Sequence, residues 1–282
     1  RFEDIWYGEV EILNVTVNAP GTVNITVNGI TIEVPLNESV TTTDVLKSAF
    51  GYDGKATWNL VNLHVGTYPA YAVYNGNENY TSVSTSDVFI VKPLPTTVNV
   101  TVDDIHVGED AVIKVNVGPS GLKGNVTIIV EGEEYTLNIT GDGAELVVSG
   151  LKAGIKHVNV SYWPGNDNYL PSENTTTFKV SKIAPPIHST THDIIYGEDE
   201  TIIIHLRGDA TGEVTIIVDG KEYTAPLKDG EAVFEIPGLK AGRYDVDVYY
   251  PGDEKYLPAS TTDSFKVSKI APPIHSTTHD II

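Results

Sequence analysis

The most constraining feature of this chain is an internal repeat of eighteen residues without a mismatch. The stretch 178–195 reads FKVSKIAPPIHSTTHDII, and the stretch 265–282 has the same letters at an offset of 87 residues. This offset is too long for a solenoid repeat and suits one small β-domain after another. The first copy continues into a further domain-length segment, whereas the second closes the printed sequence. The second copy therefore predicts either a strand that is donated to another chain or the opening of a further repeat in a longer array.

Shorter phrases recur at similar spacing and predict three homologous domains. The phrase Asp-Ile-x-(Tyr/Val)-Gly-Glu begins at Asp4, Asp104 and Asp193. A loop phrase later in each copy ends at a tyrosine, and we interpret these rings as core residues whose hydroxyls bond to the backbone: Tyr80, Tyr169 and Tyr256. The predicted domains are 1–91, 92–180 and 181–267, followed by a free or donated strand at 268–282.

The pattern inside each copy is typical of β-strands. In the third copy, residues 243–250 alternate between apolar and polar side chains, and Asp219-Gly220 joins two short apolar runs as a hairpin turn does. About seven short strands fit between residues 186 and 267, with turn residues between them. The sequence therefore predicts an all-β fold of three tandem immunoglobulin-like β-sandwich domains with a C-terminal spare strand.

Two long hairpin phrases carry a more specific resemblance. They are VTIIVDGKEYTAPLKDGEAVFEIPGLKAGRYDVDVYYPGDEKY in the third copy and NVTIIVEGEEYTLNITGDGAELVVSGLKAGIKHVNVSYWPGNDNY in the second. Both resemble the immunoglobulin-like repeats of the adhesin-like surface proteins of methanogenic archaea. The resemblance covers the second and third copies well and the first loosely. It implies extracellular stalk or adhesin work and brings no catalytic residues with it.

The net charge and the glycosylation motifs limit which classes of partner the chain can have. The formal net charge is −20 and no block is basic, so we expect no nucleic-acid partner and no membrane contact in this segment. Cysteine is absent, which excludes disulfides. Nine Asn-x-Ser/Thr motifs favour an extracellular glycoprotein, either at the cell surface or in a secreted filament. The glycosylation candidates are Asn14, Asn24, Asn37, Asn79, Asn99, Asn125, Asn138, Asn159 and Asn174.

The first domain departs from the common plan in two ways. It carries extra residues near 36–57, where Thr43–Gly51 predicts a short helix with Thr43 as its N-cap. It also lacks its opening strand, because only Arg1, Phe2 and Glu3 precede its Asp-Ile phrase. A sandwich without one strand exposes unpaired backbone groups and an open apolar groove.

The tail, defined here as Ala271–Ile282, is a strand of the missing kind. Donation of this strand to the first domain of the next chain would complete that domain and build a filament. The predicted donor residues are Ala271, Pro272, Pro273, Ile274, His275, Thr277, His279 and Ile281, and the predicted acceptor residues are Phe2, Ile5, Trp6 and Tyr7. The competing interpretation is a spacer in a longer adhesin, where the tail opens a further repeat.

No enzyme motif is present, and we expect no enzymatic activity and no cofactor. The pairs His188/His192 and His275/His279 lie in strand-like stretches, where residues four apart are about 13 Å apart and cannot share one ion. Acidic clusters at 103–110 and 193–200 leave calcium open as a minor alternative. A carbohydrate-binding surface module, with Trp6, Trp58 and Trp163 as candidates, is a further alternative. The expected partners are other copies of the chain or neighbouring repeats, and a host-cell or glycan ligand.

Overall fold

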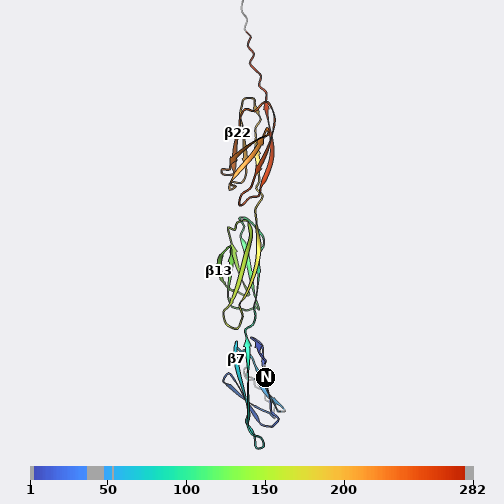
Figure 1. Ribbon diagram of the computed structural model, residues 1–282, viewed down its shortest axis with the longest axis vertical. Coiled ribbons are helices and arrows are strands. Elements are labelled where there is room, and N and C mark those ends of the chain that lie inside the picture. The colour runs from blue at the N-terminus through green and yellow to red at the C-terminus, as the bar shows by residue number, and fades with distance from the viewer. Residues whose placement is uncertain (1–2, 37–47, 53, 277–282) are drawn as a thin grey trace, which may run out of the picture. The chain divides into compact units, whose positions relative to one another are not determined.

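The computed structural model describes residues 3–36, 48–52 and 54–276 of the 282-residue chain. Every regular element in these residues is a β-strand, and the strands form three pairs of sheets that we call the first, middle and third sandwiches (Figure 1). No helix in the described residues is long and apolar enough to cross a membrane. The all-β prediction of tandem immunoglobulin-like sandwiches is confirmed.

The first sandwich packs a five-stranded sheet, in the order β1-β8-β7-β3-β4, and a three-stranded sheet, in the order β2-β6-β5. Buried side chains alternate along the strands of the two sheets, as in β3, where Val23, Ile25 and Val27 all belong to one apolar core. The strands are β1 (Ile5–Trp6), β2 (Glu11–Thr16), β3 (Thr22–Val27), β4 (Ile30–Pro35), β5 (Ser48–Tyr52), β6 (Lys55–Leu60), β7 (Gly66–Tyr74) and β8 (Val83–Lys92).

The helix predicted at Thr43–Gly51 is wrong where it can be compared. Residues 43–47 lie outside the described residues, but Ser48–Gly51 belong to β5, which pairs antiparallel with β6. The free outer edge of β6 offers a full row of backbone partners, and this outweighs the weak helical preference of a short Ser-Ala-Phe-Gly segment. The insertion therefore adds an edge strand to the first sandwich.

The middle sandwich has the sheets β10-β16-β15-β12-β13 and β14-β11-β9. Its strands are β9 (Thr97–Thr101), β10 (Ile105–His106), β11 (Ala111–Gly118), β12 (Gly124–Val130), β13 (Glu133–Asn138), β14 (Gly143–Val148), β15 (Gly154–Pro164) and β16 (Ser172–Ser181).

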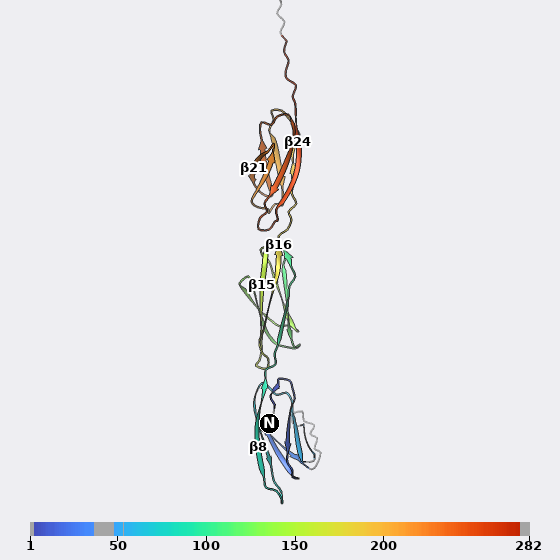
Figure 2. The same cartoon turned by 45° about the vertical axis from the view of Figure 1, so that its right-hand side comes forward.

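The third sandwich has the sheets β18-β24-β23-β20-β21 and β17-β19-β22 (Figure 2). Its strands are β17 (His188–Thr190), β18 (Ile194–Ile195), β19 (Glu200–His205), β20 (Glu213–Val218), β21 (Lys221–Pro226), β22 (Glu231–Ile236), β23 (Gly242–Tyr250) and β24 (Ala259–Ser268). The alternation predicted for residues 243–250 is confirmed, since Val246, Val248 and Tyr250 are buried, whereas Asp245 and Asp247 are exposed.

The opening segment of the middle sandwich and that of the third sandwich each pair with one strand of both sheets. In the third sandwich β17 pairs antiparallel with β19, and β18, a few residues later, pairs parallel with β24 of the other sheet. In the middle sandwich β9 and β10 make the same two pairings with β11 and β16. In the described part of the first sandwich only the second pairing occurs, between β1 and β8.

By density of packing the chain divides into two compact units, and the division passes through the middle sandwich. One unit takes in residues up to Thr101 with Lys114–Leu146 and His157–Thr176, and the other takes in Val102–Ile113, Val147–Lys156 and the residues from Thr177 onward. The boundaries 1–91, 92–180 and 181–267 therefore stay predictions.

Candidate functional site at the open edge of the first sandwich

The recurring Asp-Ile-x-x-Gly-Glu phrase is a structural motif that contains a two-residue strand and holds it against the last strand of each sandwich. Its Asp accepts a hydrogen bond from a backbone N–H of that last strand, and its Glu accepts one from the backbone N–H three residues earlier. The Gly between them has a φ of 91°, 93° or 98°, which explains why glycine recurs there. The bonds are Ile90 N–H to Asp4 (3.1 Å), Lys179 N–H to Asp104 (2.6 Å), Lys266 N–H to Asp193 (2.8 Å), Trp6 N–H to Glu9 (2.8 Å), His106 N–H to Glu109 (2.7 Å) and Ile195 N–H to Glu198 (3.0 Å).

These bonds engage several of the carboxylates that were considered for calcium. Among residues 3–36, 48–52 and 54–276, no group of three or more His, Asp or Glu side chains could hold a metal ion. The His188 ring stacks on His205 at a centroid distance of 4.8 Å, while His192 lies outside β17 and donates its backbone N–H to Glu200 at 2.7 Å. The His188 imidazole thus belongs to the packing of the opening strand, whereas the His192 side chain is exposed.

The outer edge of β2 is the place where the first sandwich differs most from the other two. β2 is the terminal strand of its sheet, and no other described strand pairs with its outer edge. A groove runs beside this edge and reaches the opposite sheet, which is where the opening strand lies in the other sandwiches. Its lining consists of Asn14, Val15 and Thr16 from β2, Ile25 from β3, Ala70, Tyr71 and Ala72 from β7, and Thr85, Ser86 and Asp87 from β8.

In the third sandwich the opening strand fills the equivalent place. His188, Ser189 and Thr190 of β17 pair with His205, Ile204 and Ile203 of β19. The hydroxyls of Ser189 and Thr191 donate to Asp263 of β24 at 2.8 and 3.2 Å. Asp87 occupies the position of Asp263, because Ile5 pairs with Val91 and Ile194 pairs with Val267, four residues after each aspartate.

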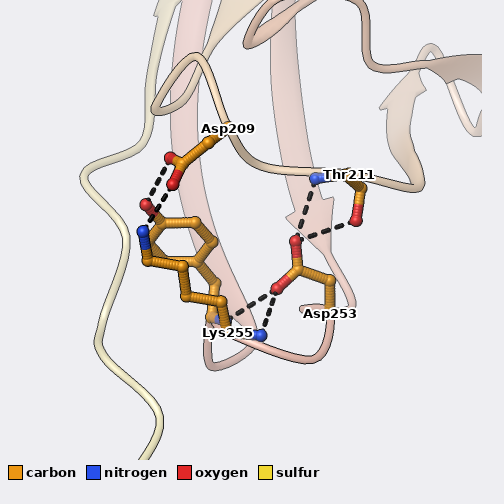
Figure 3. Close-up of polar contacts among 5 residues, drawn as sticks. Asp209, Thr211, Asp253 and Lys255 are labelled. Atoms are coloured by element: carbon orange, nitrogen blue, oxygen red, sulfur yellow. Dashed lines mark hydrogen bonds and ion pairs between the residues drawn. The ribbon is translucent and has the colours of Figure 1, made fainter. Parts of the chain in front are cut away.

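A second covered place lies at the loop between the last two strands of the third sandwich. The Asp253 carboxylate accepts hydrogen bonds from the backbone N–H groups of Lys255 (2.8 Å) and Tyr256 (2.7 Å) and from the N–H and hydroxyl of Thr211 (2.9 and 3.0 Å), as Figure 3 shows. Burial alone would raise the pKa of Asp253, but the bonds from Tyr256, Thr211 and Lys255 outweigh it and hold that pKa well below its usual range. Asp253 therefore fixes this loop as a carboxylate.

Tyr256 is buried beneath the opening segment. Its hydroxyl donates to Asp209 at 2.6 Å, and Asp209 also contacts the Lys255 ammonium at 2.5 Å. Ile183 bridges to Tyr256, with backbone bonds from Ile183 N–H to Lys255 O (3.0 Å) and from Leu257 N–H to Ile183 O (2.9 Å). The prediction of a backbone partner for the Tyr256 hydroxyl is wrong, because a carboxylate accepts this bond.

Tyrosines near the ends of β7, β15 and β23 make the hydroxyl-to-backbone bonds instead. The bonds run from Tyr74 to Pro20 (2.7 Å), from Tyr162 to Lys123 (2.8 Å) and from Tyr250 to Thr211 (2.9 Å). Tyr80, the counterpart of Tyr256 in the first sandwich, is 49% exposed. The core prediction is therefore wrong for Tyr80.

The structure places three of the predicted acceptor residues, Ile5, Trp6 and Tyr7, away from the open edge. Phe2 lies outside the described residues. Ile5 is buried on β1 against β8, Trp6 is 42% exposed with the Lys92 ammonium 6.0 Å from its ring centre, and Tyr7 packs against the core of the first sandwich. The groove residues were missed, although the alignment of Glu11 with Glu200 in the sequence would have placed Asn14–Thr16 opposite the missing strand.

The described donor residues are exposed and join no sheet. Ala271, Pro272, Pro273, Ile274 and His275 all lie beyond β24, and Ile274 is 90% exposed. Thr277, His279 and Ile281 lie outside the described residues.

The glycosylation candidates fall into three groups. Six have exposed side chains: Asn14, Asn79, Asn99, Asn125, Asn138 and Asn159. Asn24 and Asn174 are half-buried, and their amide nitrogens donate to Asn75 Oδ1 (3.4 Å) and Val98 O (2.7 Å), so a glycan there would share its nitrogen with an existing hydrogen bond. Asn37 lies outside the described residues.

Of the tryptophans considered for carbohydrate binding, Trp58 is a core residue with 1% exposure, while Trp163 is 55% exposed.

No family model matches the chain, and no curated protein matches it. Among solved structures, the crystal structure of domains A168–A170 from titin is 13% identical, covers 95% of this chain and 96% of that chain, and has a TM-score of 0.41. Sidekick-1 immunoglobulin domains 1–5 are 13% identical, with coverage of 95% and 57% and a TM-score of 0.30. The fibronectin(III)-like modules of Clostridium thermocellum CbhA are 14% identical, with coverage of 65% and 100% and a TM-score of 0.27. The fold assigned to this chain rests on its own strand pairing.

Proposed function

We propose that this chain is a structural and adhesive segment of an extracellular surface protein of the archaeal adhesin-like kind, built from tandem immunoglobulin-like sandwiches and without enzymatic activity. One observation carries the proposal. The recurring acidic residues, such as Asp193 and Glu198, bond to backbone groups of their own sandwich, so the repeats maintain a scaffold. Six exposed sequon asparagines support an extracellular location.

The proposal can be tested on intact cells of the organism that makes the protein. Antibodies raised against the chain should label the outside of unpermeabilised cells or filaments that they shed. Labelling that appears only after lysis would contradict the extracellular assignment. Enzymatic removal of N-linked glycans should also lower the apparent mass of the native protein.

A second candidate function is a filament subunit that donates its tail to the first sandwich of the next copy. The open outer edge of β2 and the exposed side chains of residues 271–276 favour it. A sheet edge with unpaired backbone groups gains hydrogen bonds when an extended strand is added, and a head-to-tail contact of this kind generates open filaments.

Negative-stain electron microscopy and sedimentation separate the two candidates. The full chain should form fibres if it is a filament subunit, and a chain that ends at Ser268, where β24 closes, should not. Isolated particles from both chains would rule out donation and leave the spacer function standing.

A further inference from the structure

Among its described residues, the first sandwich leaves two places uncovered that the third sandwich covers with one segment. The first is the outer edge of β2 with the groove beside it, and the second is the loop that carries the exposed Tyr80. In the third sandwich, Ile183 bridges to Tyr256, residues 188–190 pair with β19, and the hydroxyls of Ser189 and Thr191 donate to Asp263. A single extended segment of nine residues, 183–191, therefore spans both places.

The Tyr80 loop already has the conformation that its covered counterpart has. The Asn77 side-chain oxygen accepts hydrogen bonds from Asn79 N–H (2.8 Å) and Tyr80 N–H (3.0 Å), as Asp253 does from Lys255 and Tyr256. The loop is thus preorganised for a strand laid against it, which lowers the ordering cost of binding.

The tail repeats the covering segment without a mismatch. Residues 183–191 read IAPPIHSTT, and so do residues 270–278. Ile183 and Ile187 pack against the core of the third sandwich, whereas Ile270 and Ile274 are 51% and 90% exposed. Two exposed apolar side chains, Ile270 just before the tail and Ile274 within it, thus match the two uncovered places on the first sandwich.

We propose that residues 270–276 of a second copy bind the first sandwich at both places in the register of the third sandwich. Ile270 lies against the Tyr80 loop and Ile274 enters the groove. His275 lies opposite Thr16, and the Ser276 hydroxyl donates to Asp87. The inference rests on the filament proposal, and it moves the acceptor from Ile5, Trp6 and Tyr7 to the β2 edge and the Tyr80 loop.

The first sandwich is the preferred receptor because its counterpart is filled. In the third sandwich, residues 183–191 have the same sequence and belong to the same chain as β19, with which residues 188–190 pair. An incoming tail would therefore compete with an intramolecular strand of high effective concentration. The middle sandwich is closed in the same way by β9 on β11.

The register can be tested with single introduced cysteines, because the sequence contains no cysteine. Chains with Thr16→Cys are mixed with chains with His275→Cys, both unglycosylated, under mild oxidation. Opposed residues of an antiparallel pair are close enough for a disulfide, so disulfide-linked pairs should form. The control replaces Thr16→Cys with Asn14→Cys, two residues out of register and beyond the roughly 7 Å Cα limit for a disulfide.

The expected result is at least about tenfold more linked product with Thr16→Cys than with Asn14→Cys, because only one pair meets disulfide geometry. Equal linkage in both mixtures, or linkage in neither, overturns the proposed register. Fibres without selective linkage would leave the filament proposal standing and sink this inference. Selective linkage without fibres would support the proposed register of the contact and would count against the filament proposal.

The role of Asp87 has its own test, which uses a labelled synthetic peptide of residues 269–278. The receptor is the full chain with Ile274→Asp, which disables its exposed tail. Asp87→Asn replaces a charged acceptor with a neutral one, and the weaker hydrogen bond from Ser276 should lower the affinity for the peptide about tenfold. Glu33→Gln, an exposed charge change on β4 at the far edge of the same sheet, is the matched control and should leave the affinity unchanged.

A peptide with Ser276→Ala completes the double-mutant cycle. Asp87→Asn should weaken the unmodified peptide strongly and the Ser276→Ala peptide little further. Additive losses would show that Asp87 does not contact Ser276. A peptide that binds no variant would overturn the two-point receptor as a whole.

Discussion

The first and third sandwiches share a loop motif but not its surroundings. In both, an Asx side chain folds the loop before the last strand by accepting two backbone N–H groups, at Asn77 and at Asp253. The tyrosine that follows is fully buried in the third sandwich and 49% exposed in the first. The difference follows from Ile183, which lies over Tyr256 and has no described counterpart over Tyr80. The loop is therefore a local structure, whereas burial of its tyrosine requires a segment about seventy residues away in the chain.

The same comparison explains the different chemistry of the two loops. Asn77 makes the turn with an uncharged amide and donates to Pro20 O at 2.7 Å. Asp253 makes it with a carboxylate that also accepts two bonds from Thr211, and nearby Asp209 holds the Tyr256 hydroxyl (Figure 3). The third sandwich has thus tied its loop to the rest of the fold by charge-assisted hydrogen bonds, which are the stronger kind.

The largest effect is expected at the two tyrosines. Tyr256→Ala should destabilise the third sandwich by about 3–5 kcal/mol, because it empties a buried aromatic site. Tyr80→Ala should cost the first sandwich less than about 1 kcal/mol, since the ring is half exposed. Native-state hydrogen exchange of β23 and β24 amides measures the first effect, and Trp58 fluorescence in urea measures the second. Equal losses would show that Tyr80 is covered in solution.

The second largest difference in stability is expected between substitutions of Asp253 and Asn77. Asp253→Ala removes the acceptor of four hydrogen bonds and should cost about 2–3 kcal/mol, against about 1 kcal/mol for Asn77→Ala. The Asp253 pKa is lowered in the folded state, so its stabilisation is fully present above its unfolded value of 3.8 and is lost as pH falls through the lowered value. Hydrogen exchange or circular dichroism between about pH 4 and 2 should show acid loss in the third sandwich that Asp253→Asn reduces. Unchanged acid sensitivity in that variant would contradict the assignment.

A third pair of substitutions, at Gly8 and Gly197, should lower the free energy of unfolding of the two sandwiches by equal amounts. Gly8 and Gly197 have φ values of 91° and 98°, and a Cβ at either would meet no atom within 4 Å. Gly8→Ala and Gly197→Ala should therefore each cost about 1 kcal/mol or slightly more through backbone strain alone. Measured by urea unfolding, a clear difference between the two would mean that β1 and β18 are not held in the same way.

The smallest expected effect concerns two buried glutamates at equivalent positions. Burial raises the pKa of Glu200, and the His192 N–H bond offsets part of that rise. Burial also raises the pKa of Glu11, and the neighbouring charge of Glu3 adds to it. A raised pKa favours the folded state at pH values below the unfolded value of 4.5, and that contribution is lost as pH rises through the folded value.

Substitution by glutamine removes this titration. Glu11→Gln should flatten the fall in stability above pH 4.5 by about 1 kcal/mol or less, and Glu200→Gln should flatten it less. Thermal unfolding of the full chain at several pH values between 4 and 8 measures the slope. A larger change for Glu200→Gln would show that the His192 bond does not compensate the buried charge.

Much of the fold could be predicted from the sequence because the signals are local. The alternation of residues 243–250 and the Asp219-Gly220 turn depend on neighbours in the chain, and the strands β23, β20 and β21 appear where they predict them. Segment 43–51 has no such periodic signal, and its described part became a strand because β6 had a free edge.

The candidate site at the outer edge of β2 was less predictable, because it depends on which strand lies opposite that edge. The sequence repeats by themselves predicted tandem β-sandwiches, and they showed that the tail has the letters of the segment that opens the third sandwich. Repeated letters favour repeated local structure, because local preferences depend on neighbours in the chain. Only the tertiary structure decided that Asp87 takes the place of Asp263 beside an open groove and that Tyr80 stands uncovered. Strand register and burial are set by partners distant in the chain, and a pattern read along one strand carries no record of them.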